Sequence, residues 1–285
     1  MSLKHYLSFL LLMALQPAIA QTFVQSGLIG AFRSANSLSV NPAGYIYVAD
    51  AGSNELTKLD TLGKVIRSIG GYGWTESSFD NPSDVFANTL NVYVSDKNNN
   101  RVQLFDKDLN FLSQFSTQNS DNEKITFRYP TSSVVSTQGD LFILDSDNNR
   151  ILKFNSGGDF QAAIGGYDAG TFSLMNPRQF TIANDHLLVI DSQFLFIFDP
   201  YGNGIKKIKL PFEPDNINSL FRNVCINDKS QIVLIDETDL DSINITPVNF
   251  ISKIEEDIID ASYFNEKLYL LTKNYIMIYT KVSKD

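Results

Sequence analysis

The feature that most constrains this chain is a short apolar segment that ends in aspartate and recurs at a nearly constant interval. Its five copies end at Asp50, Asp96, Asp145, Asp191 and Asp236, which are 46, 49, 46 and 45 residues apart. A sixth apolar segment ends at Thr272, after a further 36 residues. A repeat of roughly 44 residues is typical of propeller architectures in which each unit is one four-stranded blade.

Each repeat predicts four short β-strands in succession. In the clearest copy, 81–106, a proline precedes a short strand, a turn leads to the strand ending at Asp96, and a polar corner leads to a third strand. Asn, Asp and Gly occupy the turns, where positive φ reverses the chain. We expect the first strand of each unit to line a central channel, at Ser37–Val40, Asp84–Ala87, Ser133–Ser136, Gln179–Ile182, Val224–Asn227 and Asp260–Tyr263.

The last unit supplies only three strands, between Ile258 and Tyr279. The segment Thr22–Gln25 has the pattern of a spare strand, and we expect it to complete the sixth blade as its outer strand. Closing the ring this way satisfies edges that an open array would expose. The predicted fold is therefore an all-β, six-bladed β-propeller that occupies residues 21–285.

Residues 1–20 predict a cleavable signal peptide in front of this domain. Lys4 and His5 form a basic start, 6–15 is an apolar run, and 18–20 (AIA) is a small-x-small cleavage site. The apolar run is shorter than the roughly 20 residues that span a bilayer. We therefore expect an exported, periplasmic or extracellular protein without membrane insertion.

The net charge restricts the classes of possible partner, and the cysteine content restricts how the fold can be stabilised. The formal net charge of −9 disfavours nucleic acid and anionic membrane surfaces as partners. The one cysteine, Cys225, lies in an apolar run and cannot form an intramolecular disulfide. We expect a monomer that is stabilised by its core and by ring closure, with Cys225 as a small buried hydrophobe.

Several motifs resemble the NHL-repeat family of six-bladed β-propellers, within the TolB-like/NHL-like superfamily. They are the unit-opening prolines, the Val-Ser-Asp and Ile-Leu-Asp strand ends, the Asn-Asn-Arg corners at 99–101 and 148–150, and the Gly-Gly-Tyr crossings at 70–72 and 165–167. Units two and three match well, units one and four match partly, and units five and six match only in strand pattern. The resemblance implies a propeller over the whole exported chain. We interpret the chain as an exported bacterial member.

The recurring aspartates admit two interpretations. As a ring of carboxylates they would bind cations, whereas as structural residues each would accept hydrogen bonds from its own polar corner. Because the aspartates repeat in register with the strands, the structural interpretation is favoured. A site for one ligand requires asymmetry, which this series lacks.

The candidate binding face carries the corners and the crossings between blades. Aromatic residues and arginine together have the composition of binding hot spots. The alternative is that these aromatics seal neighbouring blades. The candidate residues are Tyr72, Trp74, Arg101, Arg150, Tyr167 and Arg178, with Trp74 the strongest.

An enzymatic alternative would place chemistry in the central channel. Amidating lyases of this fold need several histidines on zinc, whereas the exported chain retains only His186. The predicted inner strands offer Asp84, Asn227 and Asp260 as weak cation ligands. No Gly-x-Ser-x-Gly nucleophile elbow occurs. We therefore assign no catalytic residue, metal or cofactor.

The sequence thus predicts an exported, non-enzymatic binding or scaffold propeller. Its partner would be a protein or a glycan, recognised by one face. The alternative is a cation-dependent hydrolase or lyase that works in the central channel.

Overall fold

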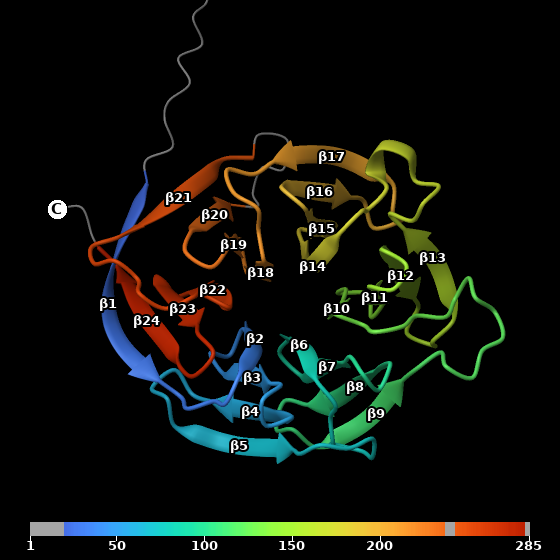
Figure 1. Cartoon of the computed structure of the whole chain (residues 1–285), viewed down its shortest axis with the longest axis horizontal. Coiled ribbons are helices and arrows are strands. Elements are labelled where there is room, and N and C mark those ends of the chain that lie inside the picture. Colours follow the sequence, from blue (N-terminus) through green and yellow to red (C-terminus); the bar gives the residue numbers. More distant parts are fainter. Residues whose placement is uncertain (1–19, 237–242, 283–285) are drawn as a thin grey trace, which may run out of the picture.

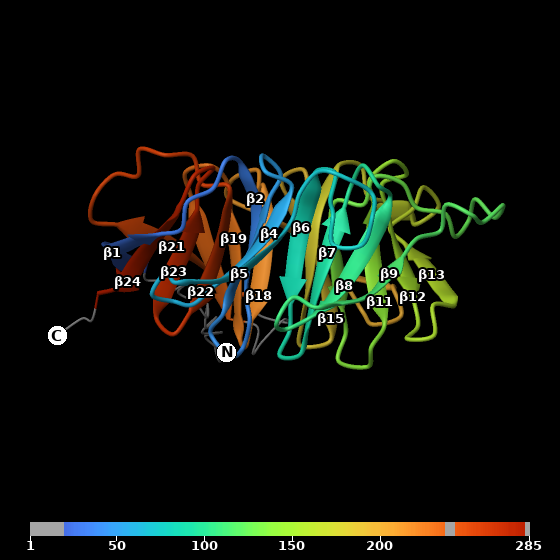
Figure 2. The ribbon, with the colours of Figure 1, turned by 90° about the horizontal axis from the view of Figure 1, so that it is seen from below.

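The computed structural model describes residues 20–236 and 243–282, whose strands form a ring of sheets around one axis (Figure 1). Viewed edge-on, the ring is a disc in which the sheets stand side by side (Figure 2). The described residues form strands β1 to β24 and the short 3-10 helix η1 (Gly170–Phe172). No helix in these ranges is long and apolar enough to cross a membrane. The predicted signal peptide lies outside the described residues, apart from Ala20.

Four separate sheets each contain four antiparallel strands, whose order in space follows their order in the sequence. The first contains β2 (Ala35–Val40), β3 (Ile46–Asp50), β4 (Glu55–Leu59) and β5 (Val65–Gly70). The second contains β6 (Pro82–Ala87), β7 (Asn91–Asp96), β8 (Arg101–Asp106) and β9 (Phe111–Phe115). The third contains β10 (Ser133–Val135), β11 (Leu141–Asp145), β12 (Arg150–Phe154) and β13 (Phe160–Ile164). The fourth contains β14 (Pro177–Ala183), β15 (His186–Asp191), β16 (Phe194–Phe198) and β17 (Gly204–Lys209).

A fifth sheet contains eight strands in the order β18-β19-β20-β21-β1-β24-β23-β22. One half contains β18 (Asn216–Leu220), β19 (Asn223–Asn227), β20 (Ile232–Asp236) and β21 (Ile245–Phe250). The other half contains β22 (Asp260–Phe264), β23 (Lys267–Leu271), β24 (Ile276–Lys281) and β1 (Gln21–Ile29). Where the sequence predicts six blades, the described residues form four separate sheets and this eight-stranded one. The two halves merge because β1 pairs with both neighbours.

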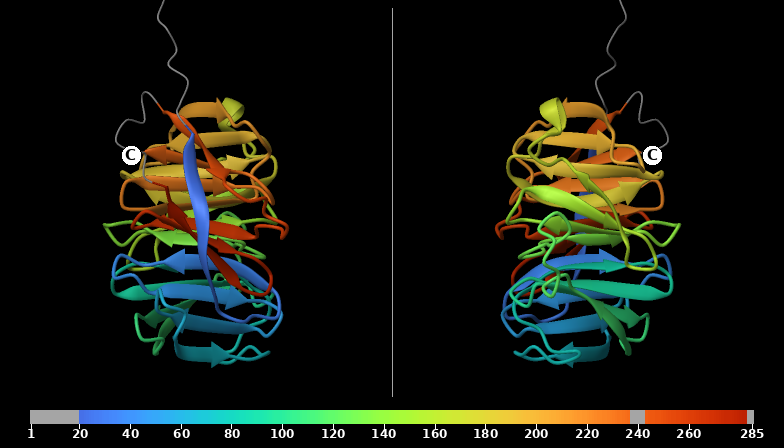
Figure 3. Two further views of the ribbon diagram at one scale, coloured as in Figure 1. Left: turned by 90° about the vertical axis from the view of Figure 1, so that its left-hand side faces the viewer. Right: turned by 90° about the vertical axis from the view of Figure 1, so that its right-hand side faces the viewer.

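The N-terminal strand β1 lies next to β24, in the place expected for the outer strand of the last unit. It pairs antiparallel with β24, so that residues from both ends of the described chain share one sheet. It is longer than the predicted Thr22–Gln25, and its first residues also pair in parallel with β21. Figure 3 shows β1 running across the outside of the ring. Phe23 anchors it, with a fully buried side chain that contacts Tyr263 edge-to-face at 6.1 Å between ring centroids.

The strand assignment in unit five was wrong by one strand. The innermost strand is β18, and Val224–Asn227 lies in the second strand. Asp236 therefore ends the third strand, where it pairs with Asn223 at the opposite end of the sheet and is exposed. The residue in the place of the other four aspartates is Asn227. The sequence misled because the turn at Phe221–Arg222 lacks the Asn or Gly that marks such turns elsewhere.

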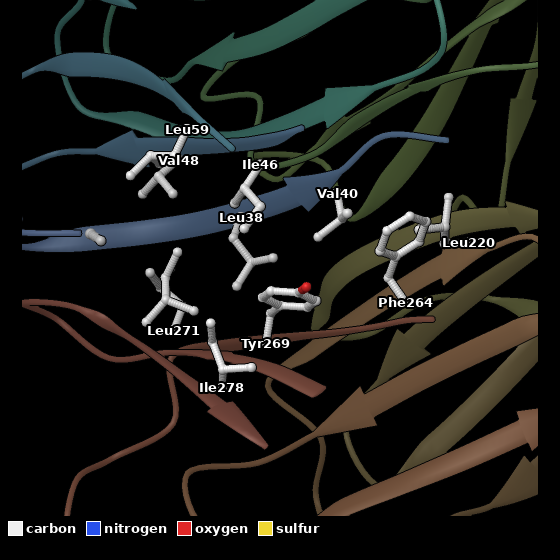
Figure 4. Packing of buried hydrophobic residues seen from close by; sticks show 12 residues of the cluster. Leu38, Val40, Ile46, Val48, Leu59, Leu220, Phe264, Tyr269, Leu271 and Ile278 are labelled. Atoms are coloured by element: carbon white, nitrogen blue, oxygen red, sulfur yellow. The ribbon is translucent and has the colours of Figure 1, made fainter. Parts of the chain in front are cut away.

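Apolar side chains fill the spaces between neighbouring sheets. One cluster joins the first sheet to β22–β24 and includes Leu38, Val48, Leu271 and Ile278 (Figure 4). Burying a side chain of this size contributes about 1.5–3 kcal/mol. Cys225 is buried in β19 as predicted, and burial raises the pKa of its thiol. These clusters fix the angle of each sheet and hence the positions of the loops.

Candidate functional site on the crossing face

One face of the ring carries both kinds of connection that the sequence analysis selected. Corners join the second strand of each sheet to the third, and crossings join each outermost strand to the next innermost strand. Pairing of Asp96 with Pro82 sets the end of β7 beside the start of β6. Pairing of Phe115 with Val102 brings the end of β9 to the same side. We call this side the crossing face.

The aspartates that end the second strands tie the crossings to the corners. Asp50 accepts hydrogen bonds from the backbone N–H groups of Arg33 (2.7 Å), Ser34 (2.8 Å) and Gly52 (2.9 Å). The other three likewise accept a backbone N–H from the incoming crossing: Asp96 from Asp80, Asp145 from Arg128, and Asp191 from Met175. These carboxylates are buried and saturated with internal donors. The structural interpretation therefore accounts for them.

Arg101 is buried and holds the crossing that contains Trp74. Its Nε donates to Asp96 Oδ2 at 2.8 Å, and its Nη1 donates to the Trp74 carbonyl at 2.7 Å and to Gln114 Oε1. Its Nη2 donates to the carbonyls of Thr75 and Ser78. Five internal hydrogen bonds use the donor capacity of a guanidinium. The structure thus gives Arg101 a positioning role beneath the face instead of a contact on it.

Arg150 holds the next crossing in the same way. Its Nε donates to Asp145 at 2.9 Å, and its Nη2 donates to the carbonyls of Glu123 and Thr126. Glu123 and Thr126 line a cavity of about 510 Å³ on the crossing face, together with Asp121 and Asp147. Arg150 therefore shapes the wall of this acidic cavity, which the sequence analysis did not select.

Arg178 lies at the start of β14, where its side chain is 37% exposed. Its Nη2 donates to Glu213 at 2.8 Å, and its Nη1 pairs with Asp215. Both acids belong to the segment that leads into β18. Exposed pairs of this kind contribute little to stability, about 0–1 kcal/mol. Of the three candidate arginines, Arg178 is the one that remains accessible.

The three candidate aromatic residues project into solvent. Tyr72 is 72% exposed, Trp74 is 75% exposed, and Tyr167 is fully exposed. Sealing between neighbouring sheets is instead performed by Phe79, which is fully buried. Packing between neighbouring sheets is therefore the role of Phe79, and it does not account for the three candidate aromatics.

Other exposed side chains on the crossings were missed, among them Tyr129 and Met175. Tyr129 is 46% exposed and Met175 is 75% exposed. Tyr129 has φ of 48°, at the position before the unit-opening proline where unit two has Asn81. A bulky residue with positive φ is unusual, whereas Asn tolerates this conformation. The signal available in the sequence was therefore an aromatic residue at a position that favours Asn.

A buried polar network fills the end of the central channel that lies next to the crossing face. Asp84 on β6 accepts hydrogen bonds from the Ser37 hydroxyl (2.8 Å) and from Gln179 Nε2 (2.9 Å). Gln179 in turn accepts the backbone N–H of Ile217 at 2.7 Å. This chain of bonds links β2, β6, β14 and β18 across the axis.

Asp260 on β22 completes the network. It accepts the Leu38 backbone N–H at 2.9 Å and the Asn218 amide at 2.6 Å. Burial, together with the nearby Asp84 carboxyl, raises the pKa of Asp260 to about 8. Burial also raises the pKa of Asp84, although its hydrogen bonds oppose the shift.

The three weak cation candidates do not all lie on innermost strands. Asp84 and Asp260 lie in the channel network, whereas Asn227 lies at the end of β19, in the second strand. No group of three or more His, Cys, Asp or Glu side chains within residues 20–236 and 243–282 is arranged to hold a metal ion. His186 begins β15, and its Nδ1 contacts the Asn184 carbonyl at 2.7 Å.

Comparison with known proteins supports the fold. No protein-family model matches the chain. Streptogramin B lyase superposes with a TM-score of 0.62 and 13% identity, over 95% of this chain and 96% of that one. An inactive virginiamycin B lyase from Staphylococcus aureus, solved with quinupristin, gives 0.59 and 14%, over 87% and 80%. At these identities the likeness establishes an all-β propeller and no more.

Two curated relatives match about half of the chain. The protein brain tumor of Drosophila melanogaster is 31% identical over 145 residues, which are 49% of this chain and 13% of that protein. The probable peptidyl-alpha-hydroxyglycine alpha-amidating lyase pgal-1 of Caenorhabditis elegans is 27% identical over 135 residues, or 45% and 39%. The chain thus spans less than half the length of either relative. These matches support an NHL-like β-propeller.

Proposed function

We propose that this protein is a non-enzymatic binding or scaffold propeller that recognises a protein partner through its crossing face. The observation that carries the proposal is the exposure of Tyr72, Trp74 and Tyr167 on crossings that are anchored from below. The Trp74 carbonyl accepts from the buried Arg101 guanidinium, so the backbone beside this indole is held in place. Rigid, exposed aromatic side chains are typical of interface hot spots. A protein partner is the role that an NHL-like propeller implies.

The test compares partner capture by the purified protein and by the double variant Tyr72→Ala/Trp74→Ala. We expect the variant to lose the specifically captured proteins, because its aromatic contacts are gone. Its melting temperature should stay within a degree or two, since surface changes cost little, about 0.5 kcal/mol. Leu62→Ala is a matched control, since Leu62 is 86% exposed in a turn on the opposite face. Equal capture by both variants would refute the proposal.

An enzymatic function in the central channel is the alternative, and the names of similar proteins favour it. Both solved relatives and one curated relative are lyases by name. A cation-dependent hydrolase or lyase would use the carboxyls of Asp84 and Asp260 in the channel. Calorimetric titration of the protein and of Asp84→Asn with Ca²⁺, Mg²⁺ and Zn²⁺ separates the two functions. Binding that is lost in the variant would favour the enzyme, and absence of binding would favour the scaffold.

We further propose that the protein is an exported, bacterial, six-bladed member, with the eight-stranded sheet counted as two blades joined through β1. The support is the strand order of that sheet, whose halves each contain four strands. The signal-peptide pattern of residues 1–20 supports export. Mass spectrometry of the secreted product tests cleavage, and a first residue other than Gln21 would contradict the predicted site.

A further inference from the structure

A cavity of about 290 Å³ lies on the ring axis at the end opposite the crossing face. Its walls are the last residues of the innermost strands and the turns that follow them. We call it the turn mouth and define it by Phe86, Val135, Ile182, Leu220 and Phe221. The buried network of Asp84 and Asp260 fills the other end of the channel. A ligand would therefore enter from the turn side.

The lining of the turn mouth is uncharged. None of the described residues that form its wall is acidic or basic, in a chain with a net charge of −9. Apolar side chains form most of the wall, and the polar part consists of neutral amides and hydroxyls. The Asn184 side chain makes no hydrogen bond within the described ranges. The Asn88 Oδ1 accepts two backbone N–H groups, whereas its Nδ2 makes no bond to the described part of the chain.

Phe221 gives the turn mouth an aromatic wall at a conformational cost. Its φ is 54°, and its side chain is 59% exposed. The corresponding turns of two other units hold Asn184 (φ 47°) and Asn265 (φ 49°). Asn tolerates this left-handed conformation, and a bulky aromatic residue does not. Strain of this kind clusters at ligand sites.

The orientation of Phe221 leaves a flat surface available. Its ring stacks on Phe264, with centroids 6.2 Å apart and an interplanar angle of 21°. A ring covered on one side and still more than half exposed presents its other surface to solvent. The result is an apolar platform beside open amide groups.

We propose that the turn mouth binds an uncharged sugar ring, whose C–H face lies on Phe221 and whose hydroxyls bond to Asn88 and Asn184. A charged ligand would find no counter-charge in the wall, and its desolvation would be unfavourable. A purely apolar ligand would leave the amides without partners, which costs free energy. The cavity has roughly the volume of ten water molecules, which suits one monosaccharide. This site is separate from the protein-binding crossing face.

The test is calorimetric or saturation-transfer NMR titration of the purified protein with methyl glucoside, methyl galactoside and methyl mannoside. Glucuronic acid, glucosamine and cyclohexanol serve as charged and apolar comparison probes. We expect at least one neutral glycoside to bind with a dissociation constant of about 1 mM or tighter. Phe221→Asn should weaken that binding roughly tenfold or more. Because Asn suits the positive φ, this variant should melt at the same or a higher temperature.

Leu62→Asn is the matched control, because Leu62 is an exposed apolar residue in the turn between β4 and β5, outside the cavity wall. It should bind the glycoside as the parent does. Three results would overturn the proposal: no binding of any neutral glycoside, preferential binding of cyclohexanol or a charged probe, or unchanged binding in Phe221→Asn. Loss of glycoside binding in Phe221→Asn with intact folding would support it.

Discussion

At the scale of single residues, burial decides whether a polar or aromatic side chain stabilises the fold or is available to a partner. Asp96 and Arg101 look like a charged site in the sequence, yet both are buried and saturated by each other and by the nearby crossing. Trp74 belongs to the segment that Arg101 holds, and its side chain is exposed. The buried ion pair therefore shapes a surface that it does not itself form.

Arg101→Ala should lower the free energy of unfolding by about 3–5 kcal/mol, because it removes the cationic partner of the buried Asp96 carboxylate and one donor from each of three backbone carbonyls. Denaturant unfolding measures this change. Arg178→Ala is the matched control and should cost about 0–1 kcal/mol, because its ion pairs are exposed. Equal losses in the two variants would contradict the positioning role of Arg101.

At the scale of elements, β1 is the strand on which ring closure depends. It pairs with β24 on one side and with β21 on the other, and it joins two four-stranded groups into one sheet. With one cysteine in the chain, no disulfide can perform this closure. The strand contributes both backbone pairing and the buried Phe23 side chain.

Deleting residues 21–26 should lower the melting temperature sharply, since it exposes the edges of β21 and β24. Phe23→Ala is the milder variant and should cost about 3–5 kcal/mol, through the lost transfer free energy and the remaining cavity. Val24→Ala, at an exposed position of the same strand, should cost about 0.5 kcal/mol or less. Thermal and denaturant unfolding test all three. An unchanged melt after the deletion would refute the closing role.

At the scale of the whole molecule, a hydrogen-bonded network with two buried carboxyls links inner strands across the axis. Asp260 and Asp84 accept bonds from strands that lie far apart in the sequence. Their position removes them from water, which disfavours the charged form of each. Ring assembly therefore makes stability depend on pH in an unusual direction.

The folded-state pKa of Asp260, about 8, lies above its ordinary value of 3.8. The stabilising contribution of its protonated form is complete below the ordinary value and is lost as pH rises through the folded value. The melting temperature should therefore fall as the pH rises from about 4 to about 8, and the raised pKa of Asp84 acts in the same direction. Asp260→Asn should flatten this slope. A slope equal to that of the parent would show that Asp260 does not titrate in this range.

The sequence determined most of the architecture, because each unit encodes its own strands and turns locally. The Asp-terminated strand, the polar corner and the unit-opening proline recur where the structure has them in units two to four. The expected position of the N-terminal strand followed from counting strands. The assignment failed in unit five, where Phe221 replaces the usual Asn in a turn and the Asp-ending pattern of β20 resembled a second strand.

Tertiary structure alone decided which side chains are available to a ligand. Arg101 and Trp74 are both binding-site candidates in the sequence. In the structure, Arg101 is buried beneath a crossing, whereas Trp74 is exposed on that crossing. The turn mouth is formed by the ends of strands that lie dozens of residues apart in the sequence. No local sequence pattern predicts it. Strand propensity and turn chemistry act over a few residues and can be read from the chain, whereas burial and cavity shape arise only when the sheets pack around a common axis.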